Sequence, residues 1–261
     1  MRPYQTLCSI LVVTGIFFHP SLSASQVFEV IHPDVAEGSF ELELLNGLSV
    51  GDVEDGEERS AHEIAFGYSF TDFWKTVVAI EIANPEGESA EFEGFEWENV
   101  FLLPFGEGHG HGNDHDHGDH GFVALEAIGV FAALEIPNHG GLGSGAAEIG
   151  PIAEIAFGRV ETVFNLLFEF PFEDDEHTGI SYAVQAQYPV LDNVGVGFEV
   201  HGGWENAFRD EREGRHFAGP AVYGDFDLGR GRVLEPRLAV LFGLTDDTPD
   251  DVISLNFELK F

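Results

Sequence analysis

The sequence is poor in cysteine and in basic residues, and these shortages exclude several classes of protein. Its only cysteine is Cys8, so the chain beyond it offers no disulfide framework and no thiolate metal site. Lys and Arg number 11 against 47 Asp and Glu, which leaves no basic cluster for nucleic-acid phosphates. The acidity fits either a proteome adapted to salt or a surface or pore that attracts cations. We therefore expect no nucleic-acid partner.

Long apolar runs are also missing. The longest, Ile10 to Phe18, has about half of the roughly twenty residues that a membrane-spanning helix needs. It follows Met1-Arg2 and precedes the small residues of Ser21 to Ala24. This order is typical of a secretory signal peptide that is cleaved near Ala24 or Ser25. We expect residues 1–24 to be the signal and the mature chain to be exported.

Helical periodicity is scarce, and strict alternation replaces it. In the last ten residues, every second side chain is apolar and lies on one face: Ile253, Leu255, Phe257, Leu259 and Phe261. The side chains between them, Ser254, Asn256, Glu258 and Lys260, lie on the other face. A strand with one dry and one wet face has this period of two. Such segments recur along the chain, near 39–46, 62–69, 74–83, 92–103, 122–136, 146–157, 160–170, 180–189, 193–203, 216–227, 234–243 and 252–261. In the fifth and tenth segments, the pattern does not decide which side chains face the lumen and which face outward.

The lengths and connections of these segments favour an up-and-down β-barrel of about twelve antiparallel strands. Most segments are close to the 9–11 residues of a tilted membrane strand, and bacterial barrels have even strand numbers. Long polar connections alternate with short ones, as expected if both termini are periplasmic. We predict a periplasmic lead-in over 25–38 and an outer-membrane barrel over 39–261. A soluble β-sandwich is the alternative, but the strand lengths, the 25 phenylalanines and the aromatic C-terminus weigh against it.

Two stretches resemble known outer-membrane proteins. An alternating last strand that ends on Phe261 resembles the signal read by the barrel assembly machinery. His62-Glu63 and Gly67 to Trp74, followed by Phe92 and Gly94 to Asn99, are similar to porin-like or transporter-like barrels grouped with the phenol-degradation meta-pathway type. The resemblance implies an outer-membrane barrel in contact with lipid and says little about substrate.

The densest feature is a loop rich in histidine and aspartate, within residues 105–121. Imidazole and carboxylate ligands suit zinc, nickel or cupric copper, and the interspersed glycines predict a loose chelator. The candidate ligands are His109, His111, Asp114, His115, Asp116, His117, Asp119 and His120. The loop joins the fourth and fifth predicted strands and would face the periplasm. The alternative is a solvated low-complexity loop, and no cofactor is required in either case.

Acidic residues gather on the strand faces opposite the apolar side chains. Rings of carboxylates in a pore favour cations. The predicted inward acids are Glu41, Glu43, Glu63, Glu81, Glu96, Glu98, Glu154, Glu161, Glu169, Glu199, Glu235 and Glu258. Lys75, Arg237 and Lys260 are the inward basic residues that could pair with them. A polar network that plugs the lumen is the alternative, since twelve strands lie between the filled and open cases.

Three function classes follow. The first is a porin-like channel that passes small, preferably cationic solutes or metal ions, with the histidine-rich loop binding metal at its inner mouth. The second is a non-conducting barrel that binds metal or serves a structural or interaction role. A membrane enzyme is the third class. No Gly-x-Ser-x-Gly elbow or phosphate-binding loop occurs in the sequence, so we expect no enzymatic activity. Trp74, Trp97 and Trp204 are predicted to lie in aromatic girdles at the membrane interfaces.

Overall fold

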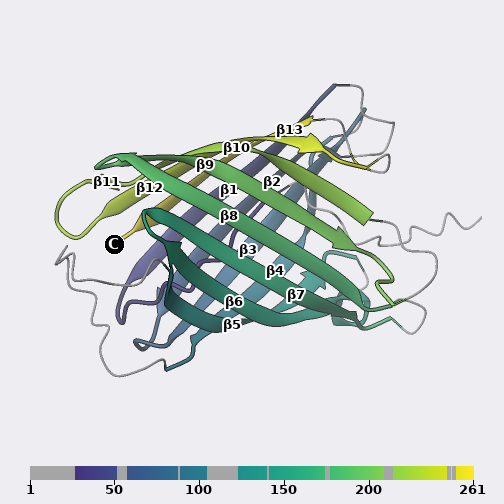
Figure 1. The fold of residues 1–261 in the computed structure, drawn as a ribbon. Coiled ribbons are helices and arrows are strands. Elements are labelled where there is room, and N and C mark those ends of the chain that lie inside the picture. Colours follow the sequence, from purple (N-terminus) through teal and green to yellow (C-terminus); the bar gives the residue numbers. More distant parts are fainter. Residues whose placement is uncertain are drawn as a thin grey trace, which may run out of the picture.

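One antiparallel sheet that closes on itself makes up the fold (Figure 1). The computed structural model describes residues 27–51, 58–87, 89–104, 123–139, 141–173, 177–208, 214–245, 248 and 251–261. Each long strand pairs with its neighbours in sequence, and β1 pairs with β13 to close the ring. The first strands are β1 (Phe40–Val50), β2 (Glu58–Ser69), β3 (Trp74–Pro85), β4 (Glu91–Leu102), β5 (Val123–Pro137), β6 (Ala146–Phe157) and β7 (Val160–Pro171). The others are β8 (Gly179–Leu191), β9 (Val194–Trp204), β10 (Gly214–Gly224), β11 (Phe226–Asp227), β12 (Val233–Gly243) and β13 (Asp251–Lys260).

The barrel has twelve long strands, and β11 is a two-residue extra strand that pairs only with β12. The predicted fold class is confirmed, and most predicted segments match a strand within two residues. The predicted segment 216–227 divides into β10, which pairs with β9 and β12, and β11, which lies beyond the end of β9 and pairs only with β12. Both β1 and β2 extend toward their connecting loop beyond the predicted 39–46 and 62–69. Gly47, Ser60 and Ala61 lie in these extensions and carry little hydrophobic contrast for a pattern to detect.

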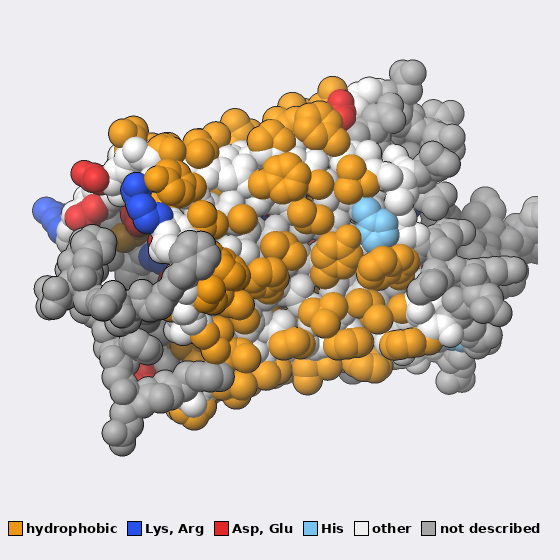
Figure 2. All heavy atoms as spheres, viewed as in Figure 1, with side chains coloured by type: hydrophobic (Ala, Val, Ile, Leu, Met, Phe, Trp, Pro, Cys, Tyr) orange, Lys and Arg blue, Asp and Glu red, His pale blue; other side chains and the backbone are white. Residues whose placement is uncertain are grey.

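The outer surface is apolar and the barrel edge is closed, so the strands suit a lipid surround. On β3, Val78 and Ile80 point outward and are exposed, whereas Val77 and Ala79 point inward and are buried. Figure 2 shows this outer face as a band of hydrophobic side chains, with charged side chains toward its two ends. Within the described residues, no helix has the length and hydropathy to cross a membrane. A closed barrel with this exterior belongs in the bacterial outer membrane.

Aromatic side chains form a belt at each end of the barrel. We call the end with the short turns and the C-terminus the turn end, and the opposite end the loop end. At the turn end, successive ring contacts cross five strands or their ends, through Phe261, Phe40, Tyr68, Phe70, Trp74 and Phe101. At the loop end, Tyr182, Trp204 and His216 contact one another. Trp74 and Trp204 thus lie in the expected belts. Trp97 instead lies near the middle of β4, and its indole N–H donates to Thr76 Oγ1 at 2.8 Å.

Residues 27–35 lie inside the barrel and residues 36–38 are exposed next to the start of β1, whereas the sequence predicts a periplasmic lead-in over 25–38. We call residues 27–38 the inner segment. Its Phe28 packs against Phe217 of β10, while Ile31 and Val35 pack with residues of β4 to β7. Burial of these apolar side chains provides the physical reason for this position, because an exposed tail would leave them in water.

Candidate functional site

Alternation along each strand directs nearly all of the predicted lumen residues toward the interior. Glu41, Glu63, Glu98, Glu169, Glu199, Lys75 and Arg237 are buried. The half-buried members of the predicted set are Glu43, Glu81, Glu96, Glu154, Glu235, Glu258 and Lys260. Glu161 follows the inward alternation of β7 but is exposed, beside the turn at 158–159. The interior therefore concentrates negative charge, with few basic groups to offset it.

A cavity of about 330 Å³ lies in the lumen between the inner segment and the strands. The acidic side chains that line it are Glu29, Glu63, Glu81, Glu96, Glu135, Glu148, Glu169 and Glu205. Among the residues that line it, Arg215 is the only Lys or Arg. A low-dielectric wall with one sign of charge raises the local concentration of counter-ions. Acidic side chains thus predominate among the charged residues that line the cavity.

Sequence reasoning missed several of these acids. Glu135 lies on β5, whose facing the pattern leaves ambiguous, and Glu29 lies in the inner segment that was expected outside the barrel. Glu148 shares the parity of Glu154 on β6, so the alternation itself carried the signal that could have found it.

Opposed glutamates recur across neighbouring strands. Glu63 of β2 faces Glu81 of β3 directly, and Glu96 of β4 faces Glu135 of β5. Directly opposed like charges destabilise a sheet unless something neutralises them. Near the turn end the chain supplies that neutralisation itself. Lys75 Nζ lies 2.9 Å from Glu41 Oε1.

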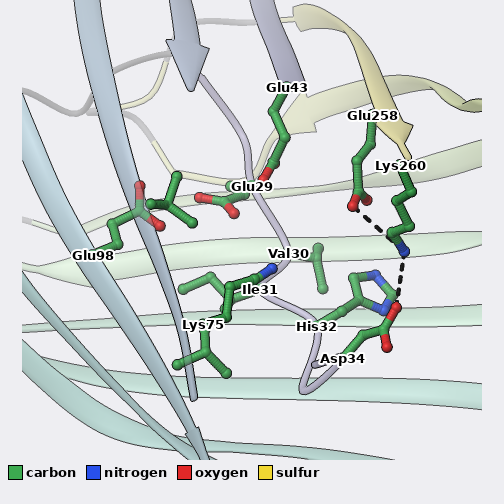
Figure 3. Close-up of a pocket in the computed structure, with 12 residues that line it drawn as sticks. Glu29, Val30, Ile31, His32, Asp34, Glu43, Lys75, Glu98, Glu258 and Lys260 are labelled. Carbon is green, nitrogen blue, oxygen red and sulfur yellow. Dashed lines mark hydrogen bonds and ion pairs between the residues drawn. The ribbon is translucent and has the colours of Figure 1, made fainter. Parts of the chain in front are cut away.

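Lys260 likewise neutralises a second group of acids. Its Nζ lies 2.9 Å from Asp34, 3.1 Å from Glu235 and 3.4 Å from Glu258. Figure 3 shows Lys260 between the carboxylates of Glu258 and Asp34, whereas the Glu29 side chain points from the inner segment to the other side, toward Glu98. Lys75 and Lys260 are therefore both paired with acids near the turn end.

Glu199 is the most completely buried carboxylate of the interior. It is 0% exposed, and it accepts a hydrogen bond from the Tyr223 hydroxyl at 3.0 Å. His201 Nε2 lies 3.0 Å from the same carboxylate, and Arg237 lies 3.5 Å from it. These residues come from β9, β10 and β12, so the network ties three strands together from the inside. Buried charges persist when they are paired in this way.

Polar side chains on roughly opposite sides of the ring hold the inner segment. Asn165 of β7 accepts a hydrogen bond from Ile31 N–H and donates one to the Ile31 carbonyl, both at 2.8 Å. Asn256 of β13 donates to the Phe28 carbonyl at 2.9 Å, and Arg237 donates to the same oxygen. Burial raises the pKa of the Glu29 carboxyl to about 6. Burial also lowers the pKa of His32 to about 4, which keeps its imidazole neutral near pH 7.

The predicted transition-metal ligands lie outside the described residues. His109, His111, Asp114, His115, Asp116, His117, Asp119 and His120 all fall within 105–122. The predicted signal peptide at 1–24 lies outside them as well. Both remain predictions from the sequence.

The fold is that of outer-membrane channels. The structure superposes on an outer-membrane channel from Pseudomonas putida F1 with a TM-score of 0.57 and 11% identity, over 89% of this chain and 100% of that one. A KdgM porin in complex with disordered oligogalacturonate matches with a TM-score of 0.52 and 9% identity, over 85% of this chain and 98% of that one. No protein-family model and no curated protein matches the sequence. The likeness establishes a porin-like barrel fold, and the grouping with the phenol-degradation type stays a prediction.

Proposed function

We propose that this chain is an outer-membrane channel that passes small solutes, with a preference for cations. The observation that carries the proposal is the acid-lined cavity of about 330 Å³ inside a closed, membrane-suited barrel. Carboxylate rings in a pore attract cations and repel anions. The barrel assembly machinery would insert the chain, and lipid would cover its apolar band.

The histidine-rich loop adds a second part to the proposal. It would bind zinc, nickel or cupric copper loosely at the turn end, since it connects β4 to β5 there. The mature chain with residues 107–120 deleted should keep its barrel but bind less zinc and change cellular metal uptake or tolerance. An unchanged metal phenotype would count against a role for the loop in metal transport.

Planar-bilayer recording of the refolded mature chain tests conduction. In a gradient of potassium chloride, we expect a steady current whose reversal potential shows that potassium permeates more readily than chloride. A reversal potential of the opposite sign would contradict the cation preference. Zinc added on the turn-end side would show whether the loop affects the current.

A non-conducting barrel is the second candidate, and the inner segment favours it. The segment spans the lumen and is held by Asn165 on one side and by Arg237 and Asn256 on another. If it stays in place, the barrel would serve in binding or interaction. Absence of current from the complete mature chain would favour this candidate, provided that heat-dependent gel mobility shows the barrel to be folded.

A further inference from the structure

Two groups of glutamates in the lumen converge at the spacing of ligands to one ion. Glu29, Glu63 and Glu98 form one group, and Glu63, Glu81 and Glu96 form the other. In each group, one oxygen from every carboxylate lies within 4.8 Å of the others. Glu63 belongs to both groups, and we call them together the Glu63 cluster.

Among the described residues, the Glu63 cluster has no ion pair with a basic side chain, although Lys75 lines a pocket together with Glu29 and Glu98. Within the described part of the chain, none of its five carboxylates forms an ion pair or a hydrogen bond with Lys, Arg or any other donor. Yet Glu63 is only 7% exposed and Glu98 only 5% exposed. Buried carboxylates without partners are costly, so their convergence calls for a proton or a cation.

A third acidic group offers an internal comparison. Glu41, Glu43 and Glu258 converge to the same extent, but this group already has two basic partners. Lys75 pairs with Glu41 and Lys260 pairs with Glu258. Within the described residues, the chain thus supplies two ion pairs to this group and none to the Glu63 cluster, on which Lys75 and Arg237 act only from a longer distance. Figure 3 shows Glu29 and Glu98 with their carboxylates turned toward the same space.

We infer that the Glu63 cluster binds a calcium ion, at either of two adjacent positions that share Glu63. Calcium takes six to eight oxygen ligands in flexible geometry, which several carboxylates and water can supply. Magnesium demands a stricter octahedron and keeps more of its water. Imidazole is absent from the cluster, which disfavours zinc and copper.

Bound calcium would also join the inner segment to the wall. Glu29 comes from the inner segment, whereas Glu63 and Glu98 come from β2 and β4. An ion bound by all three carboxylates would attach the inner segment to the barrel wall, in addition to the hydrogen bonds at Ile31 and Phe28. The site does not depend on conduction, because calcium binding at equilibrium is measured without current.

Isothermal titration of the refolded mature chain with calcium chloride tests the inference. We expect Glu63→Gln to weaken binding by about tenfold or more, since loss even of supporting groups costs metal sites 10–100-fold. Glu81→Gln and Glu98→Gln should each weaken binding less, because each alters one position only. Glu154→Gln removes an inward carboxylate outside the cluster and should leave the affinity within about twofold.

A stability measurement guards against trivial loss of folding. In a chelator, Glu63→Gln should unfold at the same or a higher urea concentration than the unaltered chain, because it relieves repulsion. Calcium should stabilise the unaltered chain and the Glu154→Gln variant, but not Glu63→Gln. Absence of calcium binding by the unaltered chain would overturn the inference. Equal binding by Glu63→Gln would also overturn it, by placing the ion on acidic loops such as 52–58.

Discussion

At the scale of single residues, the interior is governed by how each buried charge is neutralised. Glu199 has Arg237, His201 and Tyr223 around it, whereas Glu63 faces Glu81. Loss of the carboxylate therefore has opposite consequences at these two places. Removing a well-paired carboxylate leaves a buried cation uncompensated, and removing an unpaired one relieves repulsion.

Glu199→Ala should destabilise the barrel by about 3–5 kcal/mol, because it leaves the Arg237 guanidinium buried without its anion. Urea unfolding in lipid vesicles, followed by tryptophan fluorescence, measures the change. Glu91→Ala removes an exposed carboxylate on β4 and should change stability by less than about 0.5 kcal/mol. Similar values for the two variants would show that the network does not stabilise the fold.

Asn165→Ala should loosen the inner segment while the barrel stays folded. The two hydrogen bonds to Ile31 contribute about 0.5–1.5 kcal/mol each. Their loss should speed hydrogen exchange in peptides covering residues 27–38 by roughly tenfold, as read by mass spectrometry. Asn193→Ala, in an exposed turn between β8 and β9, is the matched control and should leave that exchange unchanged. Unchanged exchange in Asn165→Ala would mean that apolar packing alone holds the segment.

At the scale of elements, each strand has an outer face set by lipid and an inner face set by what lies in the lumen. The outer faces are mostly apolar, with Phe66, Val78, Leu238 and Phe242 all exposed. The inner faces differ from strand to strand. On β5 the inner face includes Phe131 and is apolar where the inner segment packs, but it is acidic at other positions.

A charge on the outer face should be costly in proportion to its depth. Ile80→Arg, near the middle of β3, should destabilise the barrel in lipid vesicles by about 2–4 kcal/mol. Val50→Arg lies at the loop end of β1 and should cost about 0–1 kcal/mol. Urea titrations of both variants give the comparison. An equal cost would contradict a membrane midplane near Ile80.

At the scale of the whole molecule, the inner segment and the barrel are separable parts. The ladder that closes the barrel runs through β1 and β13 and does not include residues 27–38. The segment instead fills the lumen through side-chain packing and a few hydrogen bonds. The lumen is thus occupied by a part that the barrel does not need for closure.

Deletion of residues 25–34 should raise single-channel conductance several-fold, since it empties the centre of the lumen. The barrel should still show heat-dependent gel mobility, although loss of the apolar contacts of Phe28 and Ile31 should lower its stability. Planar-bilayer recording of the deleted and complete mature chains makes the comparison. Equal conductance would show that the segment does not obstruct the path.

Much of this fold is determined locally and was therefore predictable. Alternation such as that of Ile253 to Phe261 reports directly which side chains face lipid, because successive residues of a strand point to opposite faces. The same rule directs Glu41, Glu63 and Glu199 inward without knowledge of the register. Loop lengths then order the strands, since short connections join antiparallel neighbours.

Only the tertiary structure decided what the lumen contains. The facing of the fifth and tenth segments is ambiguous in sequence because Phe131, Phe217 and Ala221 are apolar residues on inner faces. They pack against the inner segment, and no hydrophobic periodicity in the sequence indicates that this segment contacts these strands. The convergence on Glu63 likewise depends on the register of three strands and on Glu29, which is brought across the lumen from outside the sheet. Strand faces follow from local alternation, whereas contacts between residues far apart in sequence depend on barrel closure and on burial of the inner segment.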